Sequence, residues 1–218
     1  KLLSAPCDKG LTLRSVAKHY PSICKALSKD IMTMRYTPAP ARRQQLMLDK
    51  LRDIYSQNWE DRIVENAFSV LLNEHFKSIY HKSLYSFRKG YGSHMAIKHI
   101  AGKINSIRDD NRKAYVVKMD IRKYGDSISR KVLTNLLSDY IDSTSDYFWE
   151  LFSSFAFPTY ITNVSDKLTT NEVGISAGFS LCPVLENFFL HKLDLEITQD
   201  SNVEYIRFGD DIIVVSPS

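Results

Sequence analysis

The sequence has few cysteines and no long apolar run, and each shortage excludes a class of protein. Its three cysteines, Cys7, Cys24 and Cys182, do not stand at the spacing of a zinc site or a disulfide framework, and none of the six histidines pairs with them at zinc spacing. No apolar run approaches the roughly eighteen residues that span a membrane, and no signal-peptide pattern opens the chain. We therefore expect no membrane partner and a reducing cytoplasmic location.

The composition is that of a globular protein without repeats or low-complexity segments. A length of 218 residues allows one large domain or two modest ones, and 44% hydrophobic residues suffice for a core. The charge is unevenly distributed: residues 1–105 carry 18 Lys/Arg against 8 Asp/Glu, a net +10, and residues 106–218 carry 11 against 17, a net −6. A basic half beside an acidic half suits a protein that grips a nucleic-acid backbone and also binds metal.

Two strand-like runs, 203–208 and 212–216, flank the segment Phe208-Gly-Asp-Asp211, and a Gly-Asp pair in such a place indicates a tight hairpin. The hairpin would hold Asp210 and Asp211 together, and neighbouring carboxylates repel unless a cation neutralises them. Mg²⁺ prefers one or two carboxylates with phosphate oxygens. The pair favours metal-dependent phosphoryl chemistry, although Asp-Asp beside Gly also occurs in ordinary solvated turns.

A further acidic residue, Asp120, ends the mostly apolar run 114–120. This run predicts a buried strand that delivers Asp120 at its C-terminal edge, although a lone Asp at a strand end is usually only a cap. Helical apolar spacing follows from Ile128 onward, with Asp126 or Ser127 as the N-cap.

Between these acidic sites lies a glycine-containing segment, 174–190. Gly174 and Gly178 allow a ligand to approach the backbone closely. Pro183 suits the first turn of a helix, and the apolar residues that follow form a stripe typical of a core.

Together the three segments resemble motifs A, B and C of reverse transcriptases, in order and in spacing. Motif A corresponds to Met119-Asp-Ile121, motif B to 174–187 and motif C to Phe208-Gly-Asp-Asp211. The bacterial branch, with group II intron, retron and abortive-infection types, is the most similar. The run 120–128 and the blocks 61–64 and 86–97 carry that likeness, which covers roughly residues 35 to 216.

The resemblance implies nucleotide addition by two-metal catalysis. Two ions about 3.5–4 Å apart stabilise the attacking and the leaving oxygen. By resemblance, Asp120 and Asp210 are the paired ligands and the Ile121 carbonyl adds an oxygen, while Asp211 lies near the metals with a smaller direct role. The implied cofactor is two Mg²⁺ ions, for which Mn²⁺ can substitute.

The resemblance also assigns the basic residues. Lys50-Leu-Arg52 looks like the Lys-x-Arg of the fingers that meets the incoming triphosphate, with Lys50 as a point charge and Arg52 as a bidentate donor. Arg42, Arg43, Arg88 and Lys89 are predicted contacts to nucleic-acid phosphates. A solvated charged face is the alternative for each of these residues.

Two positions depart from the family pattern and bear on nucleotide binding. The residue five after the motif A Asp is usually an aromatic wall against the ribose 2′-hydroxyl, but here it is Gly125, preceded by Tyr124. We predict weak sugar discrimination unless Tyr124 or another group fills the gap. In motif B the usual Gln-Gly is replaced by Ala177-Gly178. The loss of Gln removes a polar contact to nucleotide or template, which favours a divergent branch associated with antiviral defence.

The implied fold is α/β (α+β), the fingers and palm of a right-hand polymerase with an antiparallel palm sheet and packed helices. Residues 1–105 would form a helical N-terminal region and fingers, and residues 106–218 a palm with motifs A, B and C. Family members continue with more palm and a helical thumb. We therefore expect a C-terminally incomplete piece from which the thumb is absent.

The leading hypothesis is an RNA-directed DNA polymerase whose partners are an RNA template, a primer strand and deoxynucleoside triphosphates. A structured non-coding RNA is a further candidate partner, because intron and retron enzymes bind one. An RNA polymerase or a template-independent polymerase is the alternative that Gly125 favours. A catalytically inactive nucleic-acid-binding scaffold is another, although a scaffold has no need to keep repelling carboxylates together. A soluble domain with coincidental motifs is the last.

Overall fold

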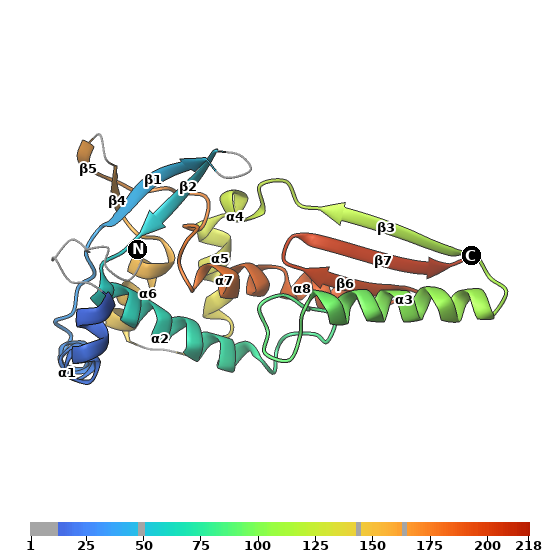
Figure 1. Ribbon diagram of the computed structural model, residues 1–218, viewed down its shortest axis with the longest axis horizontal. Helices are drawn as coiled ribbons and strands as arrows, with labels where there is room; N and C mark the ends of the chain where they lie inside the picture. Colours follow the sequence, from blue (N-terminus) through green and yellow to red (C-terminus); the bar gives the residue numbers. More distant parts are fainter. Residues whose placement is uncertain (1–12, 48–50, 143–144, 163–164) are drawn as a thin grey trace. The chain divides into compact units, whose positions relative to one another are not determined.

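The computed structural model describes residues 13–47, 51–142, 145–162 and 165–218 (Figure 1). Its elements, in chain order, are α1 (Leu13–Met32), β1 (Ala41–Met47), β2 (Leu51–Ser56), α2 (Trp59–Phe76), α3 (Ser93–Asp109), β3 (Ala114–Asp120), α4 (Tyr124–Ser127), α5 (Arg130–Ser138), α6 (Asp146–Ala156), β4 (Tyr160–Thr162), β5 (Ser165–Thr169), α7 (Cys182–Phe189), α8 (His191–Ile197), β6 (Glu204–Phe208) and β7 (Asp211–Pro217). The predicted mixture of helices with an antiparallel sheet is confirmed. No helix of this described part combines the length and the apolar character needed to span a membrane.

The chain divides into two compact units, each made of two separate stretches. Unit 1 contains Lys1–Val70 and Ser129–Cys182, and unit 2 contains Leu71–Ile128 and Pro183–Ser218. The boundary after Val70 falls within α2, so this helix contributes to both units. Residues distant in sequence are thus brought together within each unit. The division of the chain into fingers and palm stays a prediction.

Unit 1 is organised around a sheet of strand order β2-β1-β4-β5. The β1-β2 and β4-β5 pairs are antiparallel, whereas β1 and β4 are parallel. Ala41, Tyr55, Tyr160 and Phe179 form a buried cluster in this unit. A second cluster forms where Phe68 of α2 contacts three phenylalanines of α6, with ring centroids 5.8–6.1 Å apart.

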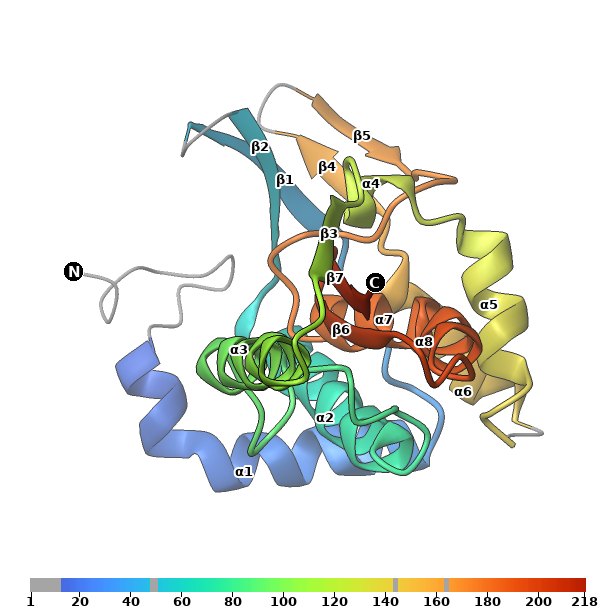
Figure 2. The same ribbon diagram turned by 90° about the vertical axis from the view of Figure 1, so that its right-hand side faces the viewer.

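Unit 2 holds the antiparallel sheet β3-β7-β6, in which β3 is an edge strand. Helix α3 packs on one face of β6, where Ile206 forms a buried cluster with Tyr85 and Ala96. The other face of β6 meets α8, where Arg207 contacts Asp194. Figure 2 shows α3 and α8 on opposite sides of β6. The strand β6 is therefore the most enclosed strand of this sheet.

Two local predictions from the sequence are wrong. The strand β3 is not buried: Val117 is 53% exposed and Met119 is 42% exposed, because the helices α3 and α8 cover mainly β6, at the opposite edge of the sheet. The helix after motif A is not capped by Asp126 or Ser127, which lie in the short helix α4. Ser129 caps α5 instead, and its hydroxyl accepts a hydrogen bond from the Val132 N–H.

Candidate active site at one end of the β3-β7-β6 sheet

The predicted hairpin is confirmed and places two aspartates at its tip. Phe208 on β6 pairs with Asp211 on β7, so Gly209 and Asp210 form a two-residue turn. Gly209 has φ 67°, whereas Asp210 does not have a positive φ. A positive φ at the first turn residue alone is the feature of a type II′ turn, in which glycine is preferred there. The glycine of the motif is thus required by the backbone, and the turn fixes where Asp210 stands.

The third aspartate arrives from β3 at the same end of the sheet. Asp120, the last residue of β3, pairs directly with Asp211, and residues in such a pair project to the same face. The chain stays close to the hairpin beyond this point, since the Ile121 N–H donates to the Asp210 carbonyl at 3.3 Å. One end of the sheet, called the carboxylate edge below, therefore brings together the sequence-predicted residues Asp120, Ile121, Asp210 and Asp211.

One cation already stands among these carboxylates. The ammonium of Lys118, two residues before Asp120 on β3, lies 2.9 Å from an Asp211 carboxylate oxygen. The hydrogen bond to Asp211 and the negative charge of that residue raise the pKa of Lys118. Like charges directly opposite each other across a strand pair destabilise a sheet, and Lys118 offsets that repulsion at the Asp120–Asp211 pair.

The donor chemistry of this edge fits a hard divalent ion, because carboxylates and a backbone carbonyl are the oxygen ligands that Mg²⁺ prefers. In residues 13–47, 51–142, 145–162 and 165–218, no group of three or more His, Cys, Asp or Glu side chains is arranged to hold a metal ion. The three carboxylates thus lie at one edge without converging on one point, and Asp211 is engaged by Lys118. An ion at this edge would compete with Lys118 for that carboxylate.

Tyr124 and Gly125, predicted to meet the nucleotide, lie in α4 shortly after Asp120. Tyr124 is buried, and its hydroxyl donates to the Glu186 carbonyl at 2.6 Å. Burial raises the pKa of this hydroxyl, which keeps it a donor. The ring also packs against Phe189, with centroids 6.4 Å apart. Tyr124 is therefore a core residue of unit 2, held by Glu186 and Phe189.

The motif B residues Ala177 and Gly178 lie in unit 1, against β2. The Ala177 carbonyl accepts the Tyr55 N–H at 2.9 Å. A Cβ on Gly178 would lie 2.7 Å from the Tyr55 carbonyl oxygen, and Gly178 has φ +109°. Both the contact and the φ require glycine, so packing within unit 1 explains a glycine at position 178 without any ligand.

We predict that Gly178→Ala lowers the melting temperature markedly. The strained backbone alone costs about 1–3 kcal/mol, or roughly 2–12 °C for a domain of this size. Gly102→Ala is the matched control, because a Cβ at Gly102 on α3 meets nothing within 4 Å. That change should stabilise the helix by about 0.5–1 kcal/mol. Differential scanning calorimetry compares the two variants. Equal melting temperatures would show that Gly178 is not required by its backbone conformation and its contact with Tyr55.

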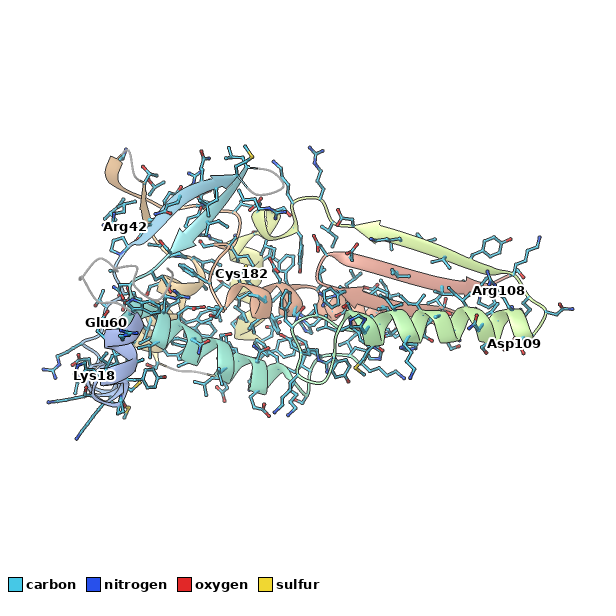
Figure 3. The ribbon with its side chains drawn as sticks, in the orientation of Figure 1. Lys18, Arg42, Glu60, Arg108, Asp109 and Cys182 are labelled. Atoms are coloured by element: carbon cyan, nitrogen blue, oxygen red, sulfur yellow. The ribbon has the colours of Figure 1, made fainter. Side chains whose placement is uncertain are left out.

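The predicted phosphate-binding residues of unit 1 lie on β1 and β2. Arg42 is exposed on β1 (Figure 3), and Arg52 is exposed on β2. Arg43 is engaged within the unit: its guanidinium contacts Asp53 at 2.6 Å and lies 5.6 Å from the centroid of the Tyr160 ring. Lys50 lies outside the described residues. Arg42 and Arg52 therefore present the more exposed charges of this set.

Arg88 and Lys89 lie in the loop that follows Leu84 in unit 2. Arg88 donates to the carbonyls of His81 and Leu84 at 2.8 and 2.9 Å, and its guanidinium lies 4.1 Å from the Tyr91 ring centroid. Through these contacts Arg88 stabilises the loop. Lys89 is exposed at a turn, where its ammonium is accessible to a phosphate.

A buried polar group that the sequence did not predict lies beneath the hairpin. Arg207 is fully buried and forms a two-point ion pair with Asp194, with Nε–Oδ1 at 2.7 Å and Nη2–Oδ2 at 2.6 Å. Burial lowers the pKa of Arg207, but the hydrogen bonds and charge of Asp194 outweigh it and raise the pKa. The feature of the sequence that could have indicated this group is an arginine within the strand-like run before the turn.

Known proteins share both the sequence pattern and the fold. The family model described as reverse transcriptase (RNA-dependent DNA polymerase) matches residues 41–218. The group II intron-encoded protein LtrA of Lactococcus lactis subsp. cremoris is 24% identical over 178 residues, which are 80% of this chain and 28% of that protein. Protein YkfC of Escherichia coli (strain K12) is 22% identical over 172 residues, 77% of this chain and 43% of that protein. The chain thus spans less than half the length of these relatives.

Solved structures agree on the fold. A chain of the partial Cas6-RT-Cas1–Cas2 complex has a TM-score of 0.53 and 21% identity, over 93% of this chain and 34% of that chain. Apo telomerase from Candida tropicalis has a TM-score of 0.59 and 12% identity, over 89% of this chain and 44% of that chain. The predicted polymerase fold class and the predicted family are confirmed. Since the family model spans most of its length, the chain belongs to the reverse transcriptase (RNA-dependent DNA polymerase) family.

Proposed function

We propose that this chain carries the nucleotidyl-transfer site of an RNA-directed DNA polymerase. The observation that carries the proposal is the sheet edge of unit 2, where Asp120 pairs with Asp211 and Asp210 occupies the adjacent turn. Together with membership of the reverse transcriptase family, this edge favours catalysis over a scaffold role. A scaffold gains nothing from opposed carboxylates, which destabilise a strand pair.

Asp120 and Asp210 would hold the divalent ions, with the Ile121 carbonyl and Asp211 as further oxygen donors. Two Mg²⁺ ions, or Mn²⁺ in their place, supply stabilisation of the attacking and leaving oxygens. Lys118 offsets the repulsion between Asp120 and Asp211 and would have to give up its contact with Asp211 for that carboxylate to hold a metal ion. The hairpin turn holds Asp210 at the sheet edge, and the register of β3 against β7 sets Asp120 beside it.

The remaining assignments follow from the same family pattern. Arg52, with Lys50, would meet the triphosphate, and Ala177 and Gly178 would lie near the nucleotide. Arg42 and Lys89 would contact template or primer phosphates, since exposed cations supply most of the sequence-independent affinity for nucleic acid. Arg43 and Arg88 are weaker candidates because their side chains are less exposed than those of Arg42 and Lys89. Fingers in residues 1–105, a palm in 106–218 and a cytoplasmic location complete the proposal.

Primer extension by the full-length protein tests the function. The reaction contains an RNA template, a DNA primer, deoxynucleoside triphosphates and Mg²⁺, and parallel reactions omit the template or add a chelator. We expect extension that requires both the template and the metal. Extension without template would assign a template-independent polymerase. No extension in any reaction would leave the scaffold alternative.

The substrate sugar is a second proposal, and Gly125 carries it. Tyr124 is buried and its hydroxyl donates to the Glu186 carbonyl, which supports a gap at Gly125 that its neighbour leaves open. We propose that ribonucleotides are accepted, as would suit a divergent, defence-associated member. The replacement of the usual Gln by Ala177 in motif B separately favours a divergent, defence-associated branch. A structured non-coding RNA remains a proposed partner by analogy with intron enzymes.

We predict that Gly125→Phe restores sugar discrimination. Gly125 does not have a positive φ, so a side chain can be added without backbone strain. The ratio of kcat/KM for a ribonucleotide to that for a deoxynucleotide should fall by roughly 10- to 200-fold, the range for steric rejection of one small group. Single-nucleotide incorporation measures it, with Gly125→Ala as the smaller control. Strong rejection of ribonucleotides by the unaltered protein would contradict the proposal.

A further inference from the structure

Two side chains hold Gly209, the first residue of the hairpin turn, through its backbone N–H and its carbonyl. The Gly209 N–H donates to the Ser86 hydroxyl oxygen at 2.9 Å, and the Gly209 carbonyl accepts from Arg207 Nη1 at 3.2 Å. Gly209 immediately precedes Asp210. The Gly209 N–H belongs to the peptide group before Gly209, and its carbonyl belongs to the peptide group that joins it to Asp210. Ser86 therefore orients the first of these groups and Arg207 the second, and both side chains lie outside the turn.

Each of these two side chains is itself fixed by buried partners. The Ser86 hydroxyl donates to Asn187 Oδ1 at 2.7 Å, and Asn187 Nδ2 donates back to the Ser86 carbonyl at 2.9 Å. A serine hydroxyl has one proton, so Ser86 Oγ acts toward Gly209 only as an acceptor. Arg207 is held by Asp194 and by the Asn187 carbonyl, at 2.9 Å from Nη2. Ser86, Asn187, Asp194 and Arg207 are all fully buried.

The loop that carries Ser86 is pinned to the same strand as the turn. The Tyr85 N–H donates to the Arg207 carbonyl at 2.9 Å, and the Arg207 N–H donates to the Ser83 carbonyl at 2.9 Å. Leu84 thus forms a parallel bridge with Arg207. The backbone of β6 places Ser86 against Gly209, and the turn gains a rigid support.

We propose that Ser86 and Arg207 are positioning residues for Asp210, and that through the Gly209 peptide they set the affinity of the carboxylate edge for its divalent ion. This inference rests on the proposed function. Arg207 and Asp194 neutralise each other, so the support adds no net charge that would compete for the metal. Groups that orient metal ligands typically change metal affinity or activity by about 10- to 100-fold when removed.

Ser86→Ala is the sharpest test, because it removes one hydroxyl and leaves the Arg207–Asp194 ion pair intact. Ser83→Ala is the matched control: Ser83 is buried in the same loop, but its hydroxyl contacts His81 Nδ1 at 2.8 Å and does not reach the turn. Primer extension is measured over a range of Mg²⁺ concentrations, Mn²⁺ binding by electron paramagnetic resonance, and stability by melting temperature.

We expect Ser86→Ala to raise the Mg²⁺ concentration for half-maximal activity, and the Kd for Mn²⁺, by about tenfold or more. Ser83→Ala should leave both at the wild-type values. A role in stability alone would lower the melting temperature without shifting either metal midpoint, and that result would overturn the inference. Inactive wild-type protein would refute the proposed function, while the Mn²⁺ titration would still decide the role of Ser86. If wild-type protein binds Mn²⁺ no more tightly than Asp210→Ala does, the inference is also overturned.

Discussion

Replacement of Asp210 by alanine is expected to abolish nucleotide incorporation without unfolding the protein. Loss of a metal-holding carboxylate removes several kcal/mol of transition-state stabilisation, and about 4 kcal/mol corresponds to roughly a thousandfold in rate. The fold should persist because the turn is held through the backbone groups of Gly209. Single-turnover incorporation with saturating Mg²⁺ gives the rate, and circular dichroism gives the melting temperature.

Asp109→Ala is the matched control for Asp210→Ala. Asp109 is exposed at the C-terminal end of α3 in the same unit, far from the hairpin turn (Figure 3). Its removal should change the rate less than about twofold, since surface substitutions away from such a site usually stay within about 0.5 kcal/mol. Substantial activity in Asp210→Ala, or equal loss in both variants, would show that the carboxylate edge is not the catalytic site.

Replacement of Arg207 by methionine should strongly destabilise the protein. The change leaves the buried Asp194 carboxylate without its cationic partner, which typically costs about 3–5 kcal/mol. At about 2–4 °C per kcal/mol for a domain of this size, the melting temperature should fall by roughly 6–20 °C. Thermal unfolding followed by calorimetry measures the effect.

Two further variants decide whether the unpaired charge is the cause. Arg43→Met breaks the corresponding Arg–Asp pair at a more exposed site, where Arg43 and Asp53 are 30% and 37% exposed, and should cost about 1 kcal/mol or less. The double change Arg207→Met with Asp194→Leu should recover part of the loss, because it removes the stranded charge. The recovery is incomplete because Tyr205 loses its Asp194 partner, at 2.7 Å. A double variant as unstable as Arg207→Met would contradict this explanation.

The hairpin and its aspartates could be predicted because their signals are local. Gly209-Asp210 between two strand-like runs specifies the turn, and strand pairing then places Asp210 and Asp211 without further information. The apolar run before Asp120 correctly placed this residue at the end of a strand, but it wrongly predicted that the strand is buried. A strand that helices cover and a strand that they leave exposed can have the same apolar pattern, since the covering helices come from other parts of the chain.

The support beneath the turn could not be predicted for the same physical reason. Ser86 and Gly209 are 123 residues apart in sequence, and no periodicity marks a loop serine as the partner of a turn amide. The close contact of Gly178 with Tyr55 likewise depends on unit 1 being folded. Tyr124 was predicted near the nucleotide because of its place in motif A, whereas packing against Phe189 and Glu186 determines its orientation.

Sequencing the product of primer extension on a defined RNA template decides whether the protein is an RNA-directed DNA polymerase. The RNA template should have a heterogeneous sequence, so that a copy is distinguishable from untemplated addition. We predict a DNA product that is the complement of the RNA, formed only with divalent metal and absent with Asp210→Ala. A product whose sequence is independent of the template, or a complementary product that persists with Asp210→Ala, would contradict the account.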